Sequence, residues 1–262
     1  MAAALVSALS ASCSAPLLRL PSGPGAPAPD GREALDQATV ACRRLSTITF
    51  EIAVSGSVGG QRTRGRLSAG LARPASARLE AVAPFGQPVF IFVANGDDAT
   101  LLLPRDNRVL EHGHPDAVLE AIAGVPLDAP ALLAVVTGCA AAPDSGRARA
   151  LGETWRVASD GSDEVYLNRE GAAGPWRLVA TVHRAAGAGW RAEYRDFQNG
   201  LPQSIRLVST LAGRFDLRLG LSQIDVNTPL GAEVFRVQIP ASAAPVSLDE
   251  LKHSGPLSAN GR

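Results

Sequence analysis

Hydrophobic and polar residues change from a helical to a strand period early in the chain. Asp30 and Glu33 have the spacing of a capping box, and apolar side chains then recur every three or four residues over about three turns. Directly afterwards apolar and polar residues alternate, with Phe50, Ile52 and Val54 on one side. This pattern predicts an N-terminal helix followed by a strand whose apolar face points into a core.

The alternating pattern continues through most of the chain and is interrupted by two short helical segments. Three dipeptides typical of tight turns, Asn95-Gly96, Asp160-Gly161 and Asn199-Gly200, separate strand-like segments. The short helices are predicted at residues 115–124 and 128–138, each closed by a glycine. The predicted order is a helix, about five strands, two short helices and about seven strands. The later strands are predicted at residues 154–157, 164–167, 177–184, 190–196, 204–209, 214–224 and 234–239.

Such a succession of strands and tight turns predicts a single antiparallel sheet. Twist accumulates between neighbouring strands, so a sheet of this length curls. The sequence therefore predicts a mainly β fold of the α+β type: a curled, antiparallel, unclosed β-barrel with an N-terminal helix and short lid helices. The interior of such a barrel is an apolar cavity, the usual form of a hydrophobic ligand site. Its expected lining residues are Phe50, Ile52, Val54 and Leu79 from the strands, and Leu132 and Val135 from the second short helix.

Composition and charge argue against several classes of protein. Hydrophobic residues make up 46% of the chain and charged residues 19%, which is too apolar for a disordered chain. The 25 basic residues equal the 25 acidic ones, so no long-range field gathers polyanions, and nucleic acid is not an expected partner. Arg62, Arg64 and Arg66 alternate along the second predicted strand, and we interpret them as its solvated face.

The N-terminus has the features of an exported lipoprotein. Residues 2–9 form a short apolar run, and Ser10-Ala11-Ser12 then precedes Cys13. Small residues before a cysteine, after an apolar stretch, are typical of a lipobox and predict export and acylation at Cys13. We interpret residues 1–13 as signal peptide and lipobox, and the proline- and glycine-rich residues 14–29 as a flexible linker.

Two features leave another kind of N-terminal processing open. No basic residue precedes Arg19, and Ser10 stands where a lipobox usually has leucine. Cleavage by the ordinary signal peptidase near Ala15, or an irregular cytosolic tail, is the alternative. After such a cleavage the protein would be soluble in the periplasm.

Cys42 and Cys139 are the other two cysteines of the chain. Two cysteines in an exported domain form a natural pair, and their bridge would close a long loop and constrain the unfolded chain by up to about 4.7 kcal/mol. Two unpaired buried thiols are the alternative, and the sequence leaves both interpretations open.

Motifs of common catalytic and cofactor sites are missing from the sequence. It contains no Gly-x-Ser-x-Gly elbow, P-loop or dinucleotide-binding glycine pattern. Glu111, His112 and His114 form the one local cluster that suggests a metal, but they lack the i, i+4 spacing of a helical site. We interpret His114 as the residue before a helix-opening proline. The sequence thus predicts neither an enzyme nor a bound metal or cofactor.

A large aromatic residue lies in a predicted turn, where polar residues are usual. Pro84, Phe85 and Gly86 connect two strand-like segments. If Phe85 is exposed, it can enter a membrane or a partner, and its burial would contribute roughly 1.5–3 kcal/mol. The alternative is that Phe85 folds back into the core. Residues 84–86 are our candidate membrane-insertion loop.

Short motifs around this loop resemble those of a known family. Their order and spacing are similar to those of LolB, the family of outer-membrane lipoprotein receptors, at Arg78-Leu79, Pro84-Phe85-Gly86, Gly124-Val125-Pro126, Leu132 and Gly138. The last third of the chain is similar to LolA-type carriers of the same superfamily at residues 190–197, Leu201-Pro202, Asp225-Val226-Asn227 and residues 235–240.

The resemblance implies a half-barrel domain over residues 30–240, followed by a polar and disordered tail at 241–262. It implies a monomeric, lipid-anchored envelope protein that holds acyl chains of lipoproteins in its cavity. Such a protein would take its cargo from a LolA-like periplasmic carrier and place it in the outer membrane. By position Phe85 corresponds to an exposed residue that this family needs for membrane insertion, and Phe90 and Phe92 would point into the cavity.

The chain also departs from the LolB pattern. Val135 stands where that family usually has a tryptophan, and additional strands are predicted between residues 154 and 184. A non-transferring lipid-binding or envelope-stress-sensing lipoprotein of the same fold is therefore the alternative function. A structural envelope lipoprotein with a filled core is a third.

Overall fold

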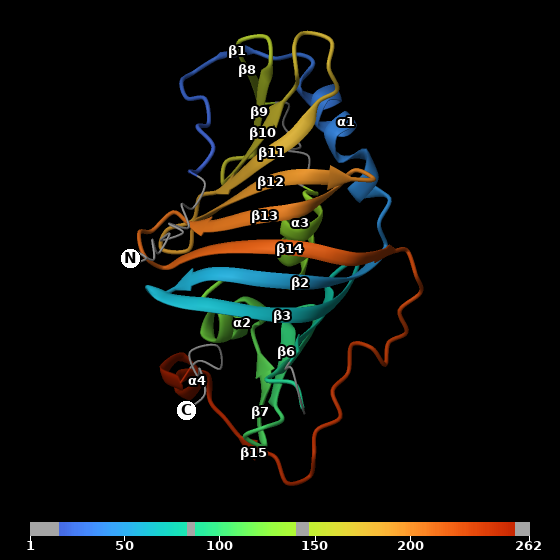
Figure 1. The fold of residues 1–262 in the computed structure, drawn as a ribbon, viewed down its shortest axis with the longest axis vertical. Coiled ribbons are helices and arrows are strands. Elements are labelled where there is room, and N and C mark those ends of the chain that lie inside the picture. Colours follow the sequence, from blue (N-terminus) through green and yellow to red (C-terminus); the bar gives the residue numbers. More distant parts are fainter. Residues whose placement is uncertain (1–15, 83–86, 140–146, 255–262) are drawn as a thin grey trace, which may run out of the picture.

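The computed structural model describes residues 16–82, 87–139 and 147–254. Fifteen strands form one sheet in the order β1-β8-β9-β10-β11-β12-β13-β14-β2-β3-β4-β5-β6-β7-β15, and all neighbours are antiparallel except β15 and β7 (Figure 1). The strands before the helical interruption are β1 (Ala26–Pro27), β2 (Thr47–Val58), β3 (Gln61–Ala72), β4 (Ser76–Val82), β5 (Ile91–Asn95), β6 (Asp98–Leu103) and β7 (Arg108–Gly113). The later strands are β8 (Ala148–Leu151), β9 (Trp155–Ser159), β10 (Asp163–Asn168), β11 (Arg177–His183), β12 (Trp190–Gln198), β13 (Leu201–Ser209), β14 (Phe215–Val226) and β15 (Ala244–Pro245).

The helices lie mostly on one side of this sheet. Helix α1 (Gly31–Arg43) packs against β8 to β11, and α3 (Ala129–Thr137) packs against β13 and β4. Helix α2 (Pro115–Ala123) contacts β6 and also α4 (Leu248–Ser254). In Figure 1, α3 lies behind β13 and β14. The predicted fold class, a mainly β fold with a curled, unclosed antiparallel sheet and few helices, is confirmed.

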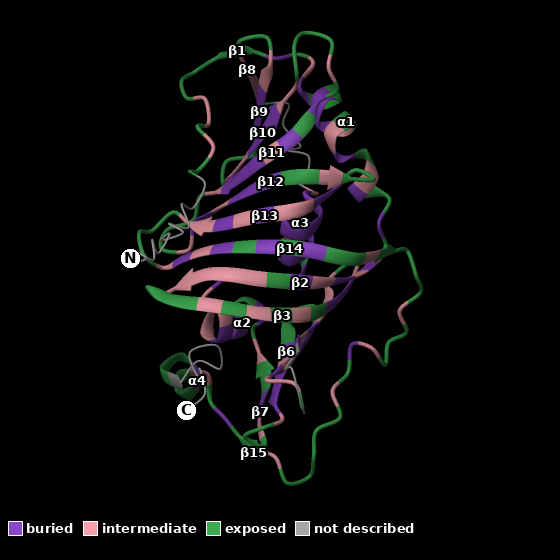
Figure 2. Cartoon of the chain, viewed as in Figure 1, coloured by how far each residue is buried: buried purple, intermediate pink, exposed green. Residues whose placement is uncertain are grey.

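Alternation along the central strands separates a concave, buried face from a convex face. In β14 the buried residues are Phe215, Leu217, Leu219 and Leu221, and polar or small residues stand between them. Figure 2 shows this change between buried and exposed positions along β14. The period of two thus places hydrocarbon on the helix-covered side. No helix of the described residues is long and apolar enough to cross a membrane.

The first described residues differ from the predicted flexible linker. Residues 16–29, which we call the N-terminal strap, pair with β8 through β1 and lie on the convex side of the sheet. The backbone N–H of Leu18 donates to Glu193 Oε1 at 2.9 Å, and the Arg191 guanidinium donates to the carbonyl of Leu18. Leu20 packs against a small apolar cluster on β9 to β11. The strap is ordered because the convex side of these strands carries apolar residues that need a cover.

The segment after β14 also differs from prediction. Val234–Ile239 is not a strand, although Phe235 is buried. Side chains bond its backbone carbonyls instead: Arg78 donates to Val234 and Arg236 at 3.0 and 2.9 Å, and Asn95 donates to Phe235 at 2.8 Å. The alternation there reflects packing on the outside of the sheet, not a ladder.

The described part of the segment predicted to be a polar, disordered tail contains a short strand and a helix. Strand β15 continues the sheet beside β7, and α4 follows it. Val246 and Leu251 are 6% and 1% exposed and belong to the main core. Two well-spaced apolar residues are enough to dock a short polar segment, and the sequence pattern did not show this.

Candidate functional site

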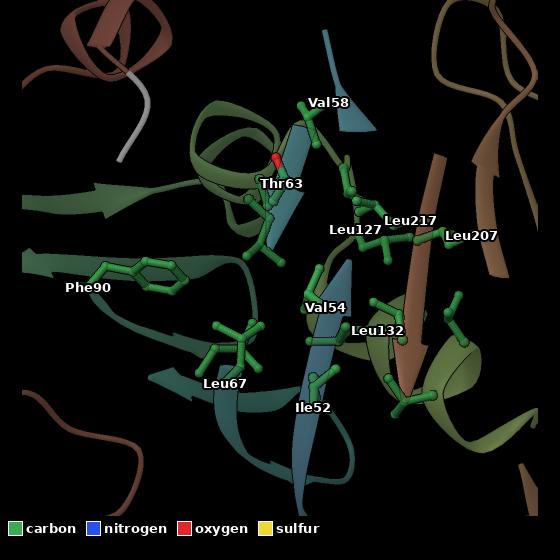
Figure 3. Close-up of a pocket in the computed structure, with 17 residues that line it drawn as sticks. Ile52, Val54, Val58, Thr63, Leu67, Phe90, Leu127, Leu132, Leu207 and Leu217 are labelled. Carbon is green, nitrogen blue, oxygen red and sulfur yellow. The ribbon is translucent and has the colours of Figure 1, made fainter. Parts of the chain in front are cut away.

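An apolar cavity lies between the concave face of the sheet and helices α2 and α3 (Figure 3). Its volume is about 90 Å³. It is lined by Ile52, Val54, Val58, Thr63, Leu67, Leu79, Phe90, Leu119, Ala123, Val125, Leu127, Leu132, Val135, Val136, Leu207, Leu217 and Leu219.

Strand register brings the sheet side of the wall together. Leu219 of β14 is opposite Val54 of β2, and Leu217 is opposite Leu207 of β13. Because alternate residues share a face, apolar residues at every second position meet across three strands.

The two short helices close the other side of the cavity. Asp128 caps α3 by accepting from the Ala131 N–H at 2.7 Å, and this fixes the helix start. Helix α2 ends at Gly124, whose φ of +70° is left-handed. A Cβ at Gly124 would lie 2.4 Å from Val58 Cγ1, so glycine lets the end of α2 approach β2 closely.

The wall of this cavity suits a hydrocarbon ligand. Only Thr63 among the lining residues carries a polar side-chain atom. Such a site offers apolar burial, worth about 0.8 kcal/mol for each methylene removed from water, and almost no hydrogen bonding. Such a wall can select an alkyl chain by shape and hydrophobicity and has almost no group to select a polar headgroup.

The cavity is small compared with a whole acyl chain. An apolar cavity of about 150 Å³ holds one benzene molecule, and this one measures about 90 Å³. It admits a short stretch of alkyl chain as it stands. A longer ligand requires α2, α3 or the segment between them to move outward.

The structure separates the predicted lining residues into two groups. Phe50 and Phe92 are 3% and 0% exposed and pack in the same core, but they lie outside the cavity wall. The wall contains Ile52, Val54, Leu79, Phe90, Leu132 and Val135. Several wall residues were missed, among them Val58, Leu207 and Leu217, although their strand alternation could have marked them.

Other predicted site residues lie outside the described part of the chain. These are the lipidation candidate Cys13 and the loop residues Pro84, Phe85 and Gly86.

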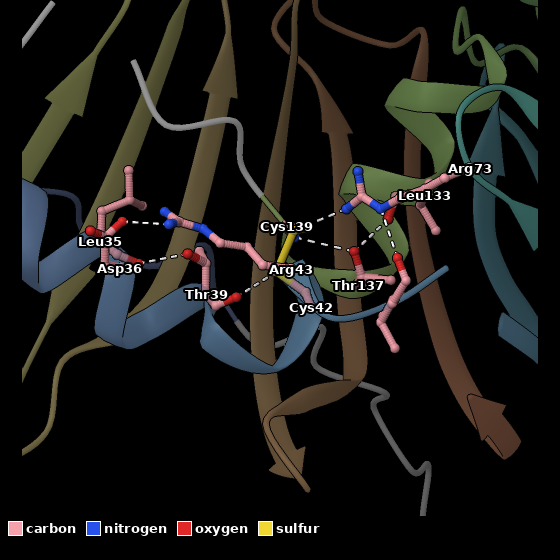
Figure 4. The surroundings of a disulfide bond; sticks show 10 residues. Leu35, Asp36, Thr39, Cys42, Arg43, Arg73, Leu133, Thr137 and Cys139 are labelled. Carbon is pink, nitrogen blue, oxygen red and sulfur yellow. Dashed lines mark hydrogen bonds and ion pairs between the residues drawn. A yellow bond between two sulfur atoms is a disulfide. The ribbon is translucent and has the colours of Figure 1, made fainter. Parts of the chain in front are cut away.

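A disulfide joins Cys42 of α1 to Cys139, which follows the end of α3 (Figure 4). The two Cα atoms are 5.4 Å apart, and 97 positions separate the residues in sequence. Arg73 lies beside the bridge and donates to the Leu45 carbonyl at 2.8 Å. The bridge therefore holds the C-terminal end of α3 against α1, at one edge of the cavity cover.

Ionisable groups with shifted pKa values lie away from the cavity. Among the described residues, none of the groups with a shifted pKa lines its wall. His112 is exposed and contacts Asp98 at 3.2 Å, and His114 precedes α2. The described residues contain no group of three or more histidine, cysteine or acidic side chains placed to hold a metal ion.

No family model and no curated protein matches this sequence. Solved structures do match the fold. A LolA superfamily protein from Nitrosomonas europaea is 11% identical with a TM-score of 0.55, and the match covers 79% of this chain and 97% of that one. The chain has a LolA-like fold. A DUF1329 family protein from Desulfovibrio piger is 9% identical with a TM-score of 0.51, over 80% of this chain and 98% of that one. At such low sequence identity, the similarity to these structures shows a common fold and nothing more.

Proposed function

We propose that this protein is a non-catalytic envelope protein that binds the acyl chains of lipids or lipoproteins in its cavity. The observation that carries the proposal is the cavity wall, in which hydrocarbon side chains from the sheet and from the two helices surround one space. The LolA-like fold and the sequence resemblance to the LolA and LolB families support it.

Binding would use weak apolar contacts and a movement of the cover. The disulfide holds the end of α3, so we expect the movement in α2 and in the residues that join it to α3. The wall offers few hydrogen bonds, so the affinity depends on apolar burial, which contributes about 0.8 kcal/mol for each methylene. A short buried stretch of alkyl chain therefore gives a moderate affinity, and moderate affinity permits the ligand to be released.

A cavity-filling substitution tests the binding site. Ala123 is a wall residue on α2, whereas Ala117 is a half-buried alanine of the same helix outside the wall. Ala123→Phe should weaken binding of the fluorescent fatty acid cis-parinaric acid at least tenfold, and Ala117→Phe should leave it nearly unchanged. Equal affinity in wild type and Ala123→Phe, with cooperative thermal unfolding retained, would contradict binding in this cavity.

Lipid anchorage at Cys13 is the second part of the proposal, and it rests on the lipobox-like sequence. Metabolic labelling with a palmitate analogue should mark the wild-type protein and fail to mark Cys13→Ala. An unlabelled wild type would remove the anchor and leave a soluble periplasmic binder.

Placement of lipoproteins in the outer membrane is the most specific part, and it rests on Phe85 and the LolB resemblance. The partner would be a LolA-like periplasmic carrier. Phe85→Glu should keep the fold and abolish transfer of an acylated lipoprotein from the carrier to membranes. Normal transfer by this variant would show that the loop is not the insertion element.

A second candidate function is lipid binding without transfer. The small cavity and the disulfide on its cover favour a protein that releases its ligand slowly. Native mass spectrometry of protein purified from its envelope distinguishes the two candidates. A bound acylated protein supports the carrier, and a bound phospholipid supports the non-transferring protein.

A further inference from the structure

The convex face of the central sheet concentrates positive charge in an otherwise neutral chain. Strand register places alternate residues of β12, β13, β14, β2 and β3 in three parallel rows. These rows are Arg62–Ser57–Asp216–Val208–Arg191, Arg64–Ser55–Arg218–Arg206–Glu193 and Arg66–Ala53–Gly220–Ser204–Arg195. We call this surface the arginine face, since it holds seven arginines and two carboxylates.

Part of the arginine face is already neutralised. Arg206 is paired with Asp216 at 2.7 Å. Arg191 donates to Glu193 at 2.5 Å, and Glu193 is 2% exposed beneath the N-terminal strap.

The other part has exposed arginines with no close ion-pair partner among the described carboxylates. Arg62, Arg64 and Arg218 are exposed and form no ion pair within 4.0 Å with a described carboxylate, although the charge of Arg218 helps to lower the pKa of Asp216. The side chain of Arg66 is 72% exposed, and its nearest carboxylate is Glu51 at 3.8 Å. Strands β3 and β14 therefore hold four guanidinium groups open to solvent on one surface.

Small residues stand between these arginines. Ser55, Ser57, Ala53, Gly220 and Ser204 occupy positions in the same rows. Side chains of this size leave the guanidinium groups reachable from a flat surface. A guanidinium group can donate two parallel hydrogen bonds to the oxygens of one phosphate group. Several exposed arginines on one surface therefore suit an array of phosphate groups.

The first described residues of the chain lie beside this face. The strap is bonded through Leu18 to Glu193 and Arg191, both members of the rows. Cys13 precedes Leu18 by five positions, and five residues reach at most about 17 Å. Leu17, also in the strap, is 37% exposed. The chain length thus keeps an acyl anchor on Cys13 within about 17 Å of Leu18, which contacts the β12 edge of the arginine face.

We propose that the arginine face binds the anionic phospholipid headgroups of the bilayer in which the chain is anchored. This rests on the proposed anchorage at Cys13 and adds an orientation to it. The convex face lies along the membrane, and the concave side with α2 and α3 faces the aqueous phase. The cavity cover is then open to an incoming ligand or carrier.

Vesicle binding by the unlipidated full-length chain tests the face without the anchor. The chain carrying Cys13→Ser is co-sedimented with vesicles of phosphatidylcholine alone, or of equal parts phosphatidylcholine and phosphatidylglycerol. We expect binding to the anionic vesicles only, decreasing with added salt. Adding Arg62→Gln, Arg64→Gln and Arg218→Gln should weaken it at least about tenfold, because each basic residue near an anionic surface contributes severalfold.

A matched variant removes the same charge elsewhere. Arg32, Arg44 and Arg177 are exposed and lie outside the arginine face. Their triple glutamine variant should bind anionic vesicles within twofold of the parent, and a triple lysine variant of the arginine face should retain most binding. Equal binding to both vesicle types, or equal loss in both glutamine variants, would overturn the proposal. Binding of cis-parinaric acid by the same variants reports on the cavity separately.

Discussion

Glu164 is the centre of an ion-pair cluster on β8, β10 and the residue after β11. Its carboxylate accepts from Arg149 and from the Tyr166 hydroxyl, both at 2.8 Å, and also from Arg184. Burial raises the pKa of this group, but the three hydrogen bonds outweigh burial and lower the pKa from 4.5 to about 2. The folded protein therefore holds Glu164 ionised at pH values where the unfolded chain protonates it.

Glu164→Gln should lower the free energy of unfolding by about 1–3 kcal/mol at pH 7, because it removes hydrogen bonds to charged partners. The folded pKa is depressed, so this stabilisation is complete above pH 4.5 and disappears as the pH falls toward 2. Urea denaturation of wild type and variant across this range measures the difference. Glu153→Gln, at an exposed carboxylate, is the control and should change stability by less than about 0.5 kcal/mol. A difference that stays constant with pH would contradict the role of the Glu164 charge.

Residue spacing identified local partners better than distant ones. Asp128 was expected to open a helix, and it caps α3. Asp30 has the same kind of capping position, but its carboxylate bonds Arg156 at 2.8 and 2.9 Å and makes no cap. Arg156 is far away in sequence, and a bidentate guanidinium is a stronger partner than a backbone N–H. Spacing along the chain cannot reveal such a competitor.

Among the secondary-structure elements, α3 is held by more than its packing. Replacing Cys42 and Cys139 with alanine should lower the free energy of unfolding by about 2–4 kcal/mol, since the bridge closes a long loop. The double substitution should also accelerate the release of cis-parinaric acid, because the C-terminal end of α3 is then no longer tied to α1. Stopped-flow displacement measures the release rate. Dithiothreitol should reproduce both effects in wild type and do nothing to the variant, and unchanged release would show that α3 does not limit ligand exchange.

Helix α4 offers a second prediction at this scale. Leu251 is 1% exposed and belongs to the main core, and its helix contacts α2. Leu251→Ala should cost about 2–5 kcal/mol, the usual range for a buried leucine. Leu211→Ala, at a side chain that is 45% exposed, should stay within about 0.5 kcal/mol. A small loss for Leu251→Ala in thermal unfolding would mean that α4 is only loosely attached.

Strands with a clear period of two and turn dipeptides were predicted well, whereas short edge elements were not. The sequence pattern missed β7 and β8, and β15 pairs over only two residues. The four residues of β8 and the two of β15 offer too few alternating positions to show a period. In β7 two buried residues, Val109 and Leu110, are adjacent, so its six residues do not alternate. The N-terminal strap and α4 were missed for a related reason: their order comes from contacts with elements far away in sequence.

For the whole molecule, periodicity predicted that a curled sheet and two short helices would surround an apolar space. It could not predict the size of that space. Phe50 lies on the same face of β2 as Ile52 and Val54, yet it packs in the core outside the cavity wall. Position along a strand decides which inward side chains meet the helices and which meet other strands. Only the packed structure contains that information.

A ligand in this space should stabilise the entire fold, because it binds the folded chain and not the unfolded one. At a free fatty acid concentration about 100 times the dissociation constant, the gain is about 2.7 kcal/mol. For a domain of this size that corresponds to a rise in melting temperature of about 5–10 °C. Delipidated wild type should show this rise in differential scanning calorimetry, and Ala117→Phe should match it. Ala123→Phe should show little or none, because its ring occupies the space that the ligand needs. A full rise in Ala123→Phe would mean that the acyl chain binds elsewhere on the molecule.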